Sequence, residues 1–306
     1  MAGDTARGKL LRQVDGLIDF EALRPLLGGQ YAEPERGGKP GYDPVLLFKL
    51  LLLERWFNLS DREVVQEAED RLSFLQFLGV APGAGLPADN TLVDFRARQE
   101  RAGGLGQVFD AVNGQLAAQG LLLQHGAIKV VDATLIAAQT RPGGKDQQGK
   151  PLEPEASYAR RKHQTHFGYK AHMGLDGRTD LVHRVCVTPA NVHDSQVFTP
   201  LLDAQDAAVT ADKAYDSAAH DRHLAQRDIA NGVLYRARRH RPLTAAQRAH
   251  NRAWSRIRGS IERKFGEMKR WHRMARALYR GRYAVEMQVH LTAIVVNLKR
   301  GLVLQG

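Results

Sequence analysis

The chain of 306 residues has only one cysteine and lacks any long apolar run. Cys186 cannot form an internal disulfide by itself, so a reducing, cytoplasmic setting is expected. The most apolar run, Val45–Leu53, is far too short to span a membrane and contains Lys49. The N-terminus also lacks a secretory pattern, because acidic residues interrupt it and no apolar core follows. These absences predict a cytoplasmic protein without membrane contact.

Acidic residues are nearly absent from one long segment of the chain. Between Arg236 and Arg282, sixteen lysines and arginines stand against only two carboxylates, Glu262 and Glu267. This segment therefore carries +14, whereas the whole chain carries +11. Such one-sided charge is typical of a protein with a polyanionic partner, and nucleic acid is favoured over a membrane surface. The alternative is a solvated helix face, although such faces usually mix charges of both signs.

The first 122 residues predict a helical domain with short loops. Asp43 and Pro44 are typical of an N-cap and a first-turn proline. Ser60 and Glu63 have the spacing of a capping box. The predicted helices lie within residues 1–30 and over residues 43–57, 60–70, 72–78, 89–98 and 105–119, with a connector rich in glycine and proline at residues 33–41.

This helical domain has two candidate roles. It is either a small bundle for packing or self-association, or a DNA-binding domain resembling a helix-turn-helix. Three arginines in or just after one predicted helix, Arg96, Arg98 and Arg101, slightly favour contact with DNA. We take Arg96 as the DNA-binding candidate of this domain.

From residue 123 onwards, short strands alternate with helices. Asp176-Gly177 is a turn signal between two strand patterns, which predicts a hairpin. The order of strand, hairpin, helix, strand, helix, strand and helix predicts an α/β domain with a mixed sheet and helices on its faces. The predicted strands cover residues 127–132, 166–175, 180–188, 207–212 and 232–236, and the helices cover residues 194–202, 217–226 and 284–298 as well as the basic segment.

Two aspartates, Asp132 and Asp212, each end a run of small or β-branched residues typical of a buried strand. Carboxylates at the ends of neighbouring strands can converge at one edge of a sheet, where their repulsion favours a hard cation between them. Glu262 is the third candidate, because burial of an apolar stripe on its helix would hold it near that edge. The residues of this stripe are Ile257, Ile261, Phe265 and Met268.

Each of these acids also has an ordinary explanation. An aspartate at a strand end is commonly a turn or cap residue. Arg258 and Glu262 can form an i,i+4 ion pair on a solvated helix, worth roughly 0.2–0.5 kcal/mol. Asp194 is expected to cap the helix that follows it. Four histidines, at positions 163, 166, 172 and 193, could suggest zinc, which the lack of a second cysteine disfavours.

The segments around the three acids resemble the signatures of a known family. Arg258, Glu262 and Lys269 have the R(3)E(6)K spacing of bacterial insertion-sequence transposases. Asp212–Tyr215 resembles the signature around the second acid of these enzymes, with Ala214 where many members have glycine, and Val131–Thr134 resembles the segment around the first. Two further segments, Leu86–Arg96 and Thr188–Asp194, are similar to others in the group. The resemblance covers nearly the whole chain, which is similar to the insertion-sequence-five family.

This resemblance implies a DDE transposase, with a ribonuclease-H-like catalytic domain at residues 123–306 and an N-terminal helical domain at residues 1–122 for DNA-end binding, dimerisation or both. Asp132, Asp212 and Glu262 would be the catalytic residues and would bind two Mg²⁺ or Mn²⁺ ions. One ion would activate a water and the other would stabilise the leaving 3′ oxygen. The nicked 3′-OH would then attack target DNA.

The same resemblance implies the partners. These are double-stranded DNA, as inverted-repeat ends and as target, and a second copy of the chain at the synapse, in a bacterial cytoplasm near the nucleoid. Arg258, Lys269, Tyr215 and Lys170 would contact DNA in the catalytic domain. Rival interpretations are a DNA-binding protein that has lost catalysis or been domesticated, a metal nuclease of the same fold that does not transpose, and a helical scaffold with a basic face.

Overall fold

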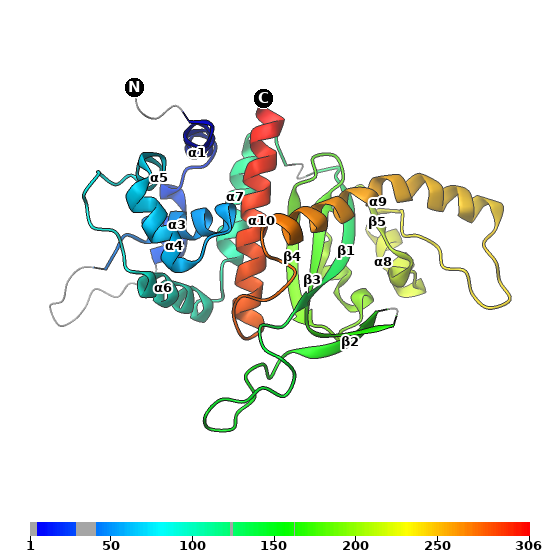
Figure 1. Cartoon of the computed structure of the whole chain (residues 1–306). Coiled ribbons are helices and arrows are strands. Elements are labelled where there is room, and N and C mark those ends of the chain that lie inside the picture. Colours follow the sequence, from blue (N-terminus) through cyan, green and yellow to red (C-terminus); the bar gives the residue numbers. More distant parts are fainter. Residues whose placement is uncertain (1–4, 29–40, 123–124, 162) are drawn as a thin grey trace. The chain divides into compact units, whose positions relative to one another are not determined.

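The computed structural model describes residues 5–28, 41–122, 125–161 and 163–306, which form two compact units (Figure 1). Unit 1 comprises Met1–Gln119 and His290–Gly306, and unit 2 comprises Gly120–Val289. The chain passes from unit 1 to unit 2 between Gln119 and Gly120, close to the predicted domain boundary at residues 122 and 123. The structure differs from the prediction at the C-terminus, where His290–Gly306 belongs to unit 1 and not to the unit that contains residues 120–289. None of the described helices combines the length and apolar character needed to cross a membrane.

Unit 1 is helical, as its sequence predicts. The Asp43 carboxylate accepts hydrogen bonds from the amides of Val45 and Leu46, and Ser60 and Glu63 form the predicted capping box. Most of the predicted connector, residues 33–40, lies outside the described residues. The helices are α1 (Ala6–Leu17), α2 (Arg24–Gly28), α3 (Pro44–Phe57), α4 (Asp61–Asp70), α5 (Leu72–Leu78), α6 (Asp89–Arg101), α7 (Gly106–Ala118) and the larger part of α10 (Arg282–Gln305), with a 3-10 turn at Glu21–Leu23.

Arg96 lies in the interior of unit 1. Its side chain is only 5% exposed, and its Nη1 donates to Oε2 of the equally buried Glu54 at 3.0 Å. Its Nη2 pairs with the carboxylate of Asp61. Both partners belong to the protein itself, so the structure does not support the predicted contact between Arg96 and DNA. The arginine connects α6 to α3 and α4 instead.

Unit 2 contains the predicted mixed sheet, confirming the α/β, ribonuclease-H-like fold class. β1 pairs with β3 in antiparallel and with β5 in parallel, β4 pairs with β3 in antiparallel, and β6 pairs with β5 in parallel. β2, which the sequence does not predict, pairs with the first part of β3. The strands are β1 (Ile128–Ala137), β2 (Ser157–Arg161), β3 (Gln164–Asp176), β4 (Val182–Pro189), β5 (Ala208–Ala211) and β6 (Ala230–Asn231).

Three predicted elements of unit 2 differ from the structure. β1 does not end at Asp132 but continues to Ala137, because β3 pairs with it along that whole length. The strand predicted at residues 232–236 is a two-residue strand at Ala230–Asn231. The helix predicted at residues 194–202 is two 3-10 turns, η2 (Asp194–Val197) and η3 (Thr199–Leu201).

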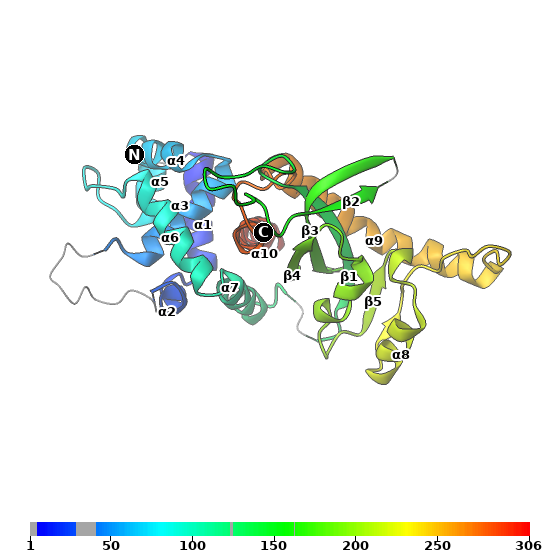
Figure 2. The same cartoon turned by 90° about the horizontal axis from the view of Figure 1, so that it is seen from below.

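The basic segment forms the long helix α9 (Ala245–Trp271). Thr244 and Gln247 form a capping box at its start. Its buried residues lie only in its second half, which contacts β1 and β5. The first half extends past the edge of the sheet in both views (Figures 1 and 2), beyond the shorter helix α8 (Ala218–Gln226). This arrangement places one half of the basic helix beside the sheet and exposes the other half.

Candidate active site

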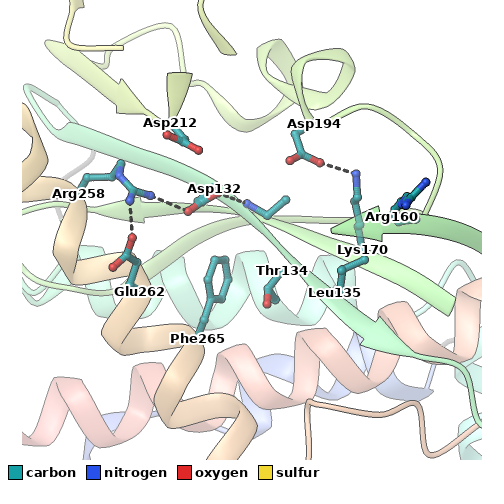
Figure 3. A pocket seen from close by; sticks show the side chains of 12 residues that line it. Asp132, Thr134, Leu135, Arg160, Lys170, Asp194, Asp212, Arg258, Glu262 and Phe265 are labelled. Carbon is teal, nitrogen blue, oxygen red and sulfur yellow. Dashed lines mark hydrogen bonds and ion pairs between the residues drawn. The ribbon is translucent and has the colours of Figure 1, made fainter. Parts of the chain in front are cut away.

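The site lies where β5 stops and β1 continues. The parallel pairing of β1 and β5 ends with Val131 opposite Ala211. Asp132 and Asp212 are the next residues of these two neighbouring strands, so both carboxylates emerge at the same edge of the sheet. A cavity of about 430 Å³ opens at this edge (Figure 3). Its lining includes the side chains of Asp132, Thr134, Leu135, Arg160, Lys170, Asp194, Asp212, Arg258, Glu262 and Phe265.

Helix α9 brings the third predicted acid, Glu262, to this cavity. The buried side chains of Ile261, Phe265 and Met268 fix the helix against the sheet, as the predicted apolar stripe requires. Arg258 lies one turn before Glu262, and its Nη1 donates to Asp132 Oδ2 at 2.9 Å. Its Nη2 pairs with Glu262 Oε1. One guanidinium therefore lies between two of the three predicted metal ligands (Figure 3).

The charge of Asp132 is poorly compensated. The pKa of this carboxyl group is raised to about 6, chiefly by burial and to a smaller extent by the neighbouring carboxylates of Asp212 and Asp194, while the amide of Ala133 and the guanidinium of Arg258 lower it. The cavity is lined by four acids, Asp132, Asp194, Asp212 and Glu262, and by three cations, Arg160, Lys170 and Arg258. This excess of negative charge is the usual electrostatic condition for binding a cation.

The carboxylate donors are of the type that fits a hard divalent ion. In this structure, however, their oxygens are not grouped around one point. Carboxylate oxygens are the ligands that Mg²⁺ prefers, and three predicted ligands face one cavity. Among the described residues, no three His, Cys, Asp or Glu side chains are grouped closely enough to hold an ion. Glu262, whose side chain is 59% exposed, pairs with Arg258 instead of approaching Asp212. A metal ion would therefore replace the guanidinium between Asp132 and Glu262.

Asp194 is a fourth carboxylate in the cavity, and the sequence prediction for it is wrong. The N-cap of η2 is His193, whose Nδ1 accepts from the amide of Ser195 at 3.3 Å. The Asp194 carboxylate instead pairs with Lys170 Nζ at 2.7 Å, and the same ammonium donates to the carbonyl of Val192 at 2.8 Å. Figure 3 shows this pair at the side of the cavity away from Arg258. Lys170 therefore lines the cavity, and its contact with DNA stays a prediction.

Two other predicted DNA contacts lie elsewhere. Tyr215 is fully buried in an apolar cluster with Phe198 and Leu224, so its side chain is not exposed for the predicted contact with DNA. Burial and the nearby charges of the cavity acids raise the pKa of its hydroxyl. Lys269 is half-buried on the Glu262 side of α9 and does not line the cavity. Arg160, on the unpredicted strand β2, does line it.

Comparison with known proteins found two family models and similar solved structures. Residues 124–298, more than half of the chain, match the family model described as "Transposase DDE domain". Residues 3–98 match the model described as "Transposase domain (DUF772)". A cryo-EM structure of a piggyBac transposase synaptic complex with hairpin DNA is 11% identical, with a TM-score of 0.49, over 98% of this chain and 75% of that one. A pre-cleavage Mos1 transpososome is 10% identical, with a TM-score of 0.21, over 97% and 98% of the two chains.

Proposed function

Because this chain belongs to the DDE transposase family of insertion sequences, we propose that it binds the ends of a transposable element, cleaves the DNA there and joins the freed 3′-OH to target DNA. The observation that carries this proposal is the convergence of Asp132, Asp212 and Glu262, far apart in the sequence, on one cavity. Membership of the insertion-sequence-five family remains a prediction.

In this proposal, Asp132, Asp212 and Glu262 would hold two Mg²⁺ or Mn²⁺ ions. When bound, such ions would supply an activated water and neutralisation of charge on the leaving 3′ oxygen. Arg258, displaced from Asp132 and Glu262, turns its guanidinium to the scissile phosphate, for which its planar fork is suited. Lys170, held by Asp194 and the Val192 carbonyl, presents a second cation at the other side of the cavity. The chain therefore positions the phosphodiester between two cations.

The remaining parts of the proposal concern the partners. Unit 1 recognises the end sequence, because contacts to phosphates alone carry no sequence information. Two copies of the chain pair two ends, which predicts a homodimer in the DNA complex. Mass measurement of the complex with a duplex of the end sequence tests this expectation. A complex with one chain bound to two paired ends would contradict it.

The function is tested with the purified full chain and a duplex that carries the inverted repeat flanking its gene. We expect nicking at the end of the repeat with Mg²⁺ or Mn²⁺ and none with a chelator. A pre-nicked end supplied with a target plasmid should become joined to it. Binding of the duplex without nicking would favour a protein that has lost catalysis. Nicking without joining would favour a nuclease that does not transpose.

The pair of Lys170 and Asp194 gives a separate prediction. Lys170→Met should lower cleavage about 10- to 100-fold, since a hydrogen bond to a charged group is worth roughly 1.5–3 kcal/mol. Asp194→Asn should lower it less, and the double variant should be no slower than Lys170→Met, because Asp194 acts by positioning Lys170. Lys150→Met, a change of an exposed lysine outside the cavity, is the matched control. Additive losses in the double variant would show that Asp194 acts independently.

A further inference from the structure

The outward face of α9 carries arginines and glycines in a regular order. Successive positions on this face are four, three, four, three and four residues apart, so they form one stripe along the helix. From the first to the last position the stripe is about 27 Å long, at 1.5 Å per residue. It consists of Arg252, Arg256, Gly259, Arg263, Gly266 and Arg270.

This stripe is opposite the face that packs on the sheet, where Ile261 and Met268 are buried. All four arginines of the stripe are exposed. The acids on either side of the stripe are engaged elsewhere: Glu262 pairs with Arg258, and Glu267 pairs with Lys264 at 2.9 Å. The stripe is therefore positive along its whole length, with no carboxylate within it.

The two glycines are not explained by the fold. Both lie inside a regular helix without positive φ. A Cβ at Gly266 would meet nothing within 4 Å, and a Cβ at Gly259 would meet only the Arg263 guanidinium, at 3.6 Å. Glycine in a helix interior is destabilising relative to alanine. A helix that retains two glycines on its exposed, arginine-lined face is suited to close approach by a partner's backbone.

We propose that the Arg252–Arg270 stripe binds the sugar–phosphate backbone of the duplex next to the cleavage site, with phosphates close to Gly259 and Gly266 and the arginines on both sides. This inference rests on the proposed function, which places DNA in the adjoining cavity. Glu262, at the rim of that cavity, directly precedes Arg263 of the stripe, so one strand can pass from the stripe to the acids. A second copy of the chain is a poor occupant, because two such stripes repel each other.

The experiment measures binding of the full chain to the end duplex in chelator, over a range of salt concentrations, together with the midpoint of denaturant unfolding. Gly259→Ala combined with Gly266→Ala should raise the unfolding midpoint and yet weaken binding about tenfold, which is about 1.4 kcal/mol. Gly114→Ala, at an exposed position of α7 with nothing within 4 Å of the added Cβ, should raise the midpoint and leave binding unchanged. A raised unfolding midpoint together with weaker DNA binding in the glycine variant would be a signature of the proposed contact.

Arginine variants keep the test decisive if the glycine variant fails to fold. Arg252→Gln and Arg263→Gln should each weaken binding of all duplex sequences and lower the salt dependence of log K by about 1. Arg227→Gln, at an exposed arginine outside α9, should change neither. Unaltered duplex binding in the arginine variants would overturn the inference, as would a change in oligomeric mass without a change in DNA binding. Metal-dependent cleavage would still test the proposed function separately.

Discussion

Asp132→Ala, Asp212→Ala and Glu262→Ala are each expected to lower metal-dependent cleavage at least about a thousandfold. Metal ions at a phosphoryl centre are worth several kcal/mol of transition-state stabilisation, and each 1.4 kcal/mol is a factor of ten in rate. Binding of the end duplex in chelator should remain close to that of the parent protein, since exposed arginines and lysines bind DNA without metal. Single-turnover cleavage and binding assays measure the two quantities.

Asp132→Asn separates loss of catalysis from loss of folding. Burial raises the pKa of Asp132 to about 6 in the folded chain, so its charge is disfavoured there. A raised carboxyl pKa favours folding most at acidic pH, and this contribution is lost as pH rises through about 6. Near pH 7 we therefore expect the asparagine variant, without metal, to gain roughly 1–3 kcal/mol in free energy of unfolding. It should gain little at pH 4 and should be inactive at both values.

Glu267→Gln is the matched control for the acid variants. Glu267 lies five residues after Glu262 on α9 but pairs with Lys264 and does not line the cavity. Its replacement should leave cleavage by the folded protein within about threefold of the parent, because Glu267 contacts neither the cavity nor its acids. Any loss of stability should come from the buried Lys264, which loses this partner. Equal losses for Glu267→Gln and the three alanine variants, or unrelated effects among those three, would favour the helical scaffold over an active site.

The local signals in the sequence were sufficient for much of the fold. Asp43 and Ser60 accept hydrogen bonds from amides at the start of their own helices, and Asp176-Gly177 lies in the turn between adjacent strands. In each case the interacting residues are only a few positions apart in the sequence. The strand prediction failed where pairing is distant in sequence. Asp132 looks like a strand end because it is an acid that follows a run of small or β-branched residues, but β3 pairs with β1 as far as Ala137.

The site shows the same division between local and distant information. The three acids could be predicted because each stands in a motif, and the apolar stripe of α9 fixes the side from which Glu262 approaches. Asp194 was misassigned because a cap and a partner of Lys170 have the same local sequence, and only the pairing of β3 with β4 brings Lys170 near it. Arg160 was missed because its strand forms only against β3.

Arg96→Ala is expected to destabilise unit 1 by about 3 kcal/mol, because it leaves the buried carboxylate of Glu54 without its 3.0 Å partner. This loss in free energy of unfolding should lie at the lower end of the range for a broken buried ion pair, because Arg55 Nη2 remains 3.8 Å from Glu54. Denaturant unfolding of the full chain measures this loss. Arg101→Ala, an exposed change at the end of the same helix, should alter stability by less than about 0.5 kcal/mol.

The same variant decides between the two roles of Arg96. If the arginine is structural, the fraction of Arg96→Ala that remains folded should bind the end duplex with the parent's salt dependence. If the arginine contacts a phosphate, the slope of log K against log salt should fall by about 1 while stability hardly changes. Glu54→Gln provides the converse test: it should destabilise through the same buried pair, whereas loss of an acid from a DNA-binding surface should strengthen binding. Matching stability losses for Arg96→Ala and Glu54→Gln, with the parent's salt slope retained, would place Arg96 in the packing of α6 on α3.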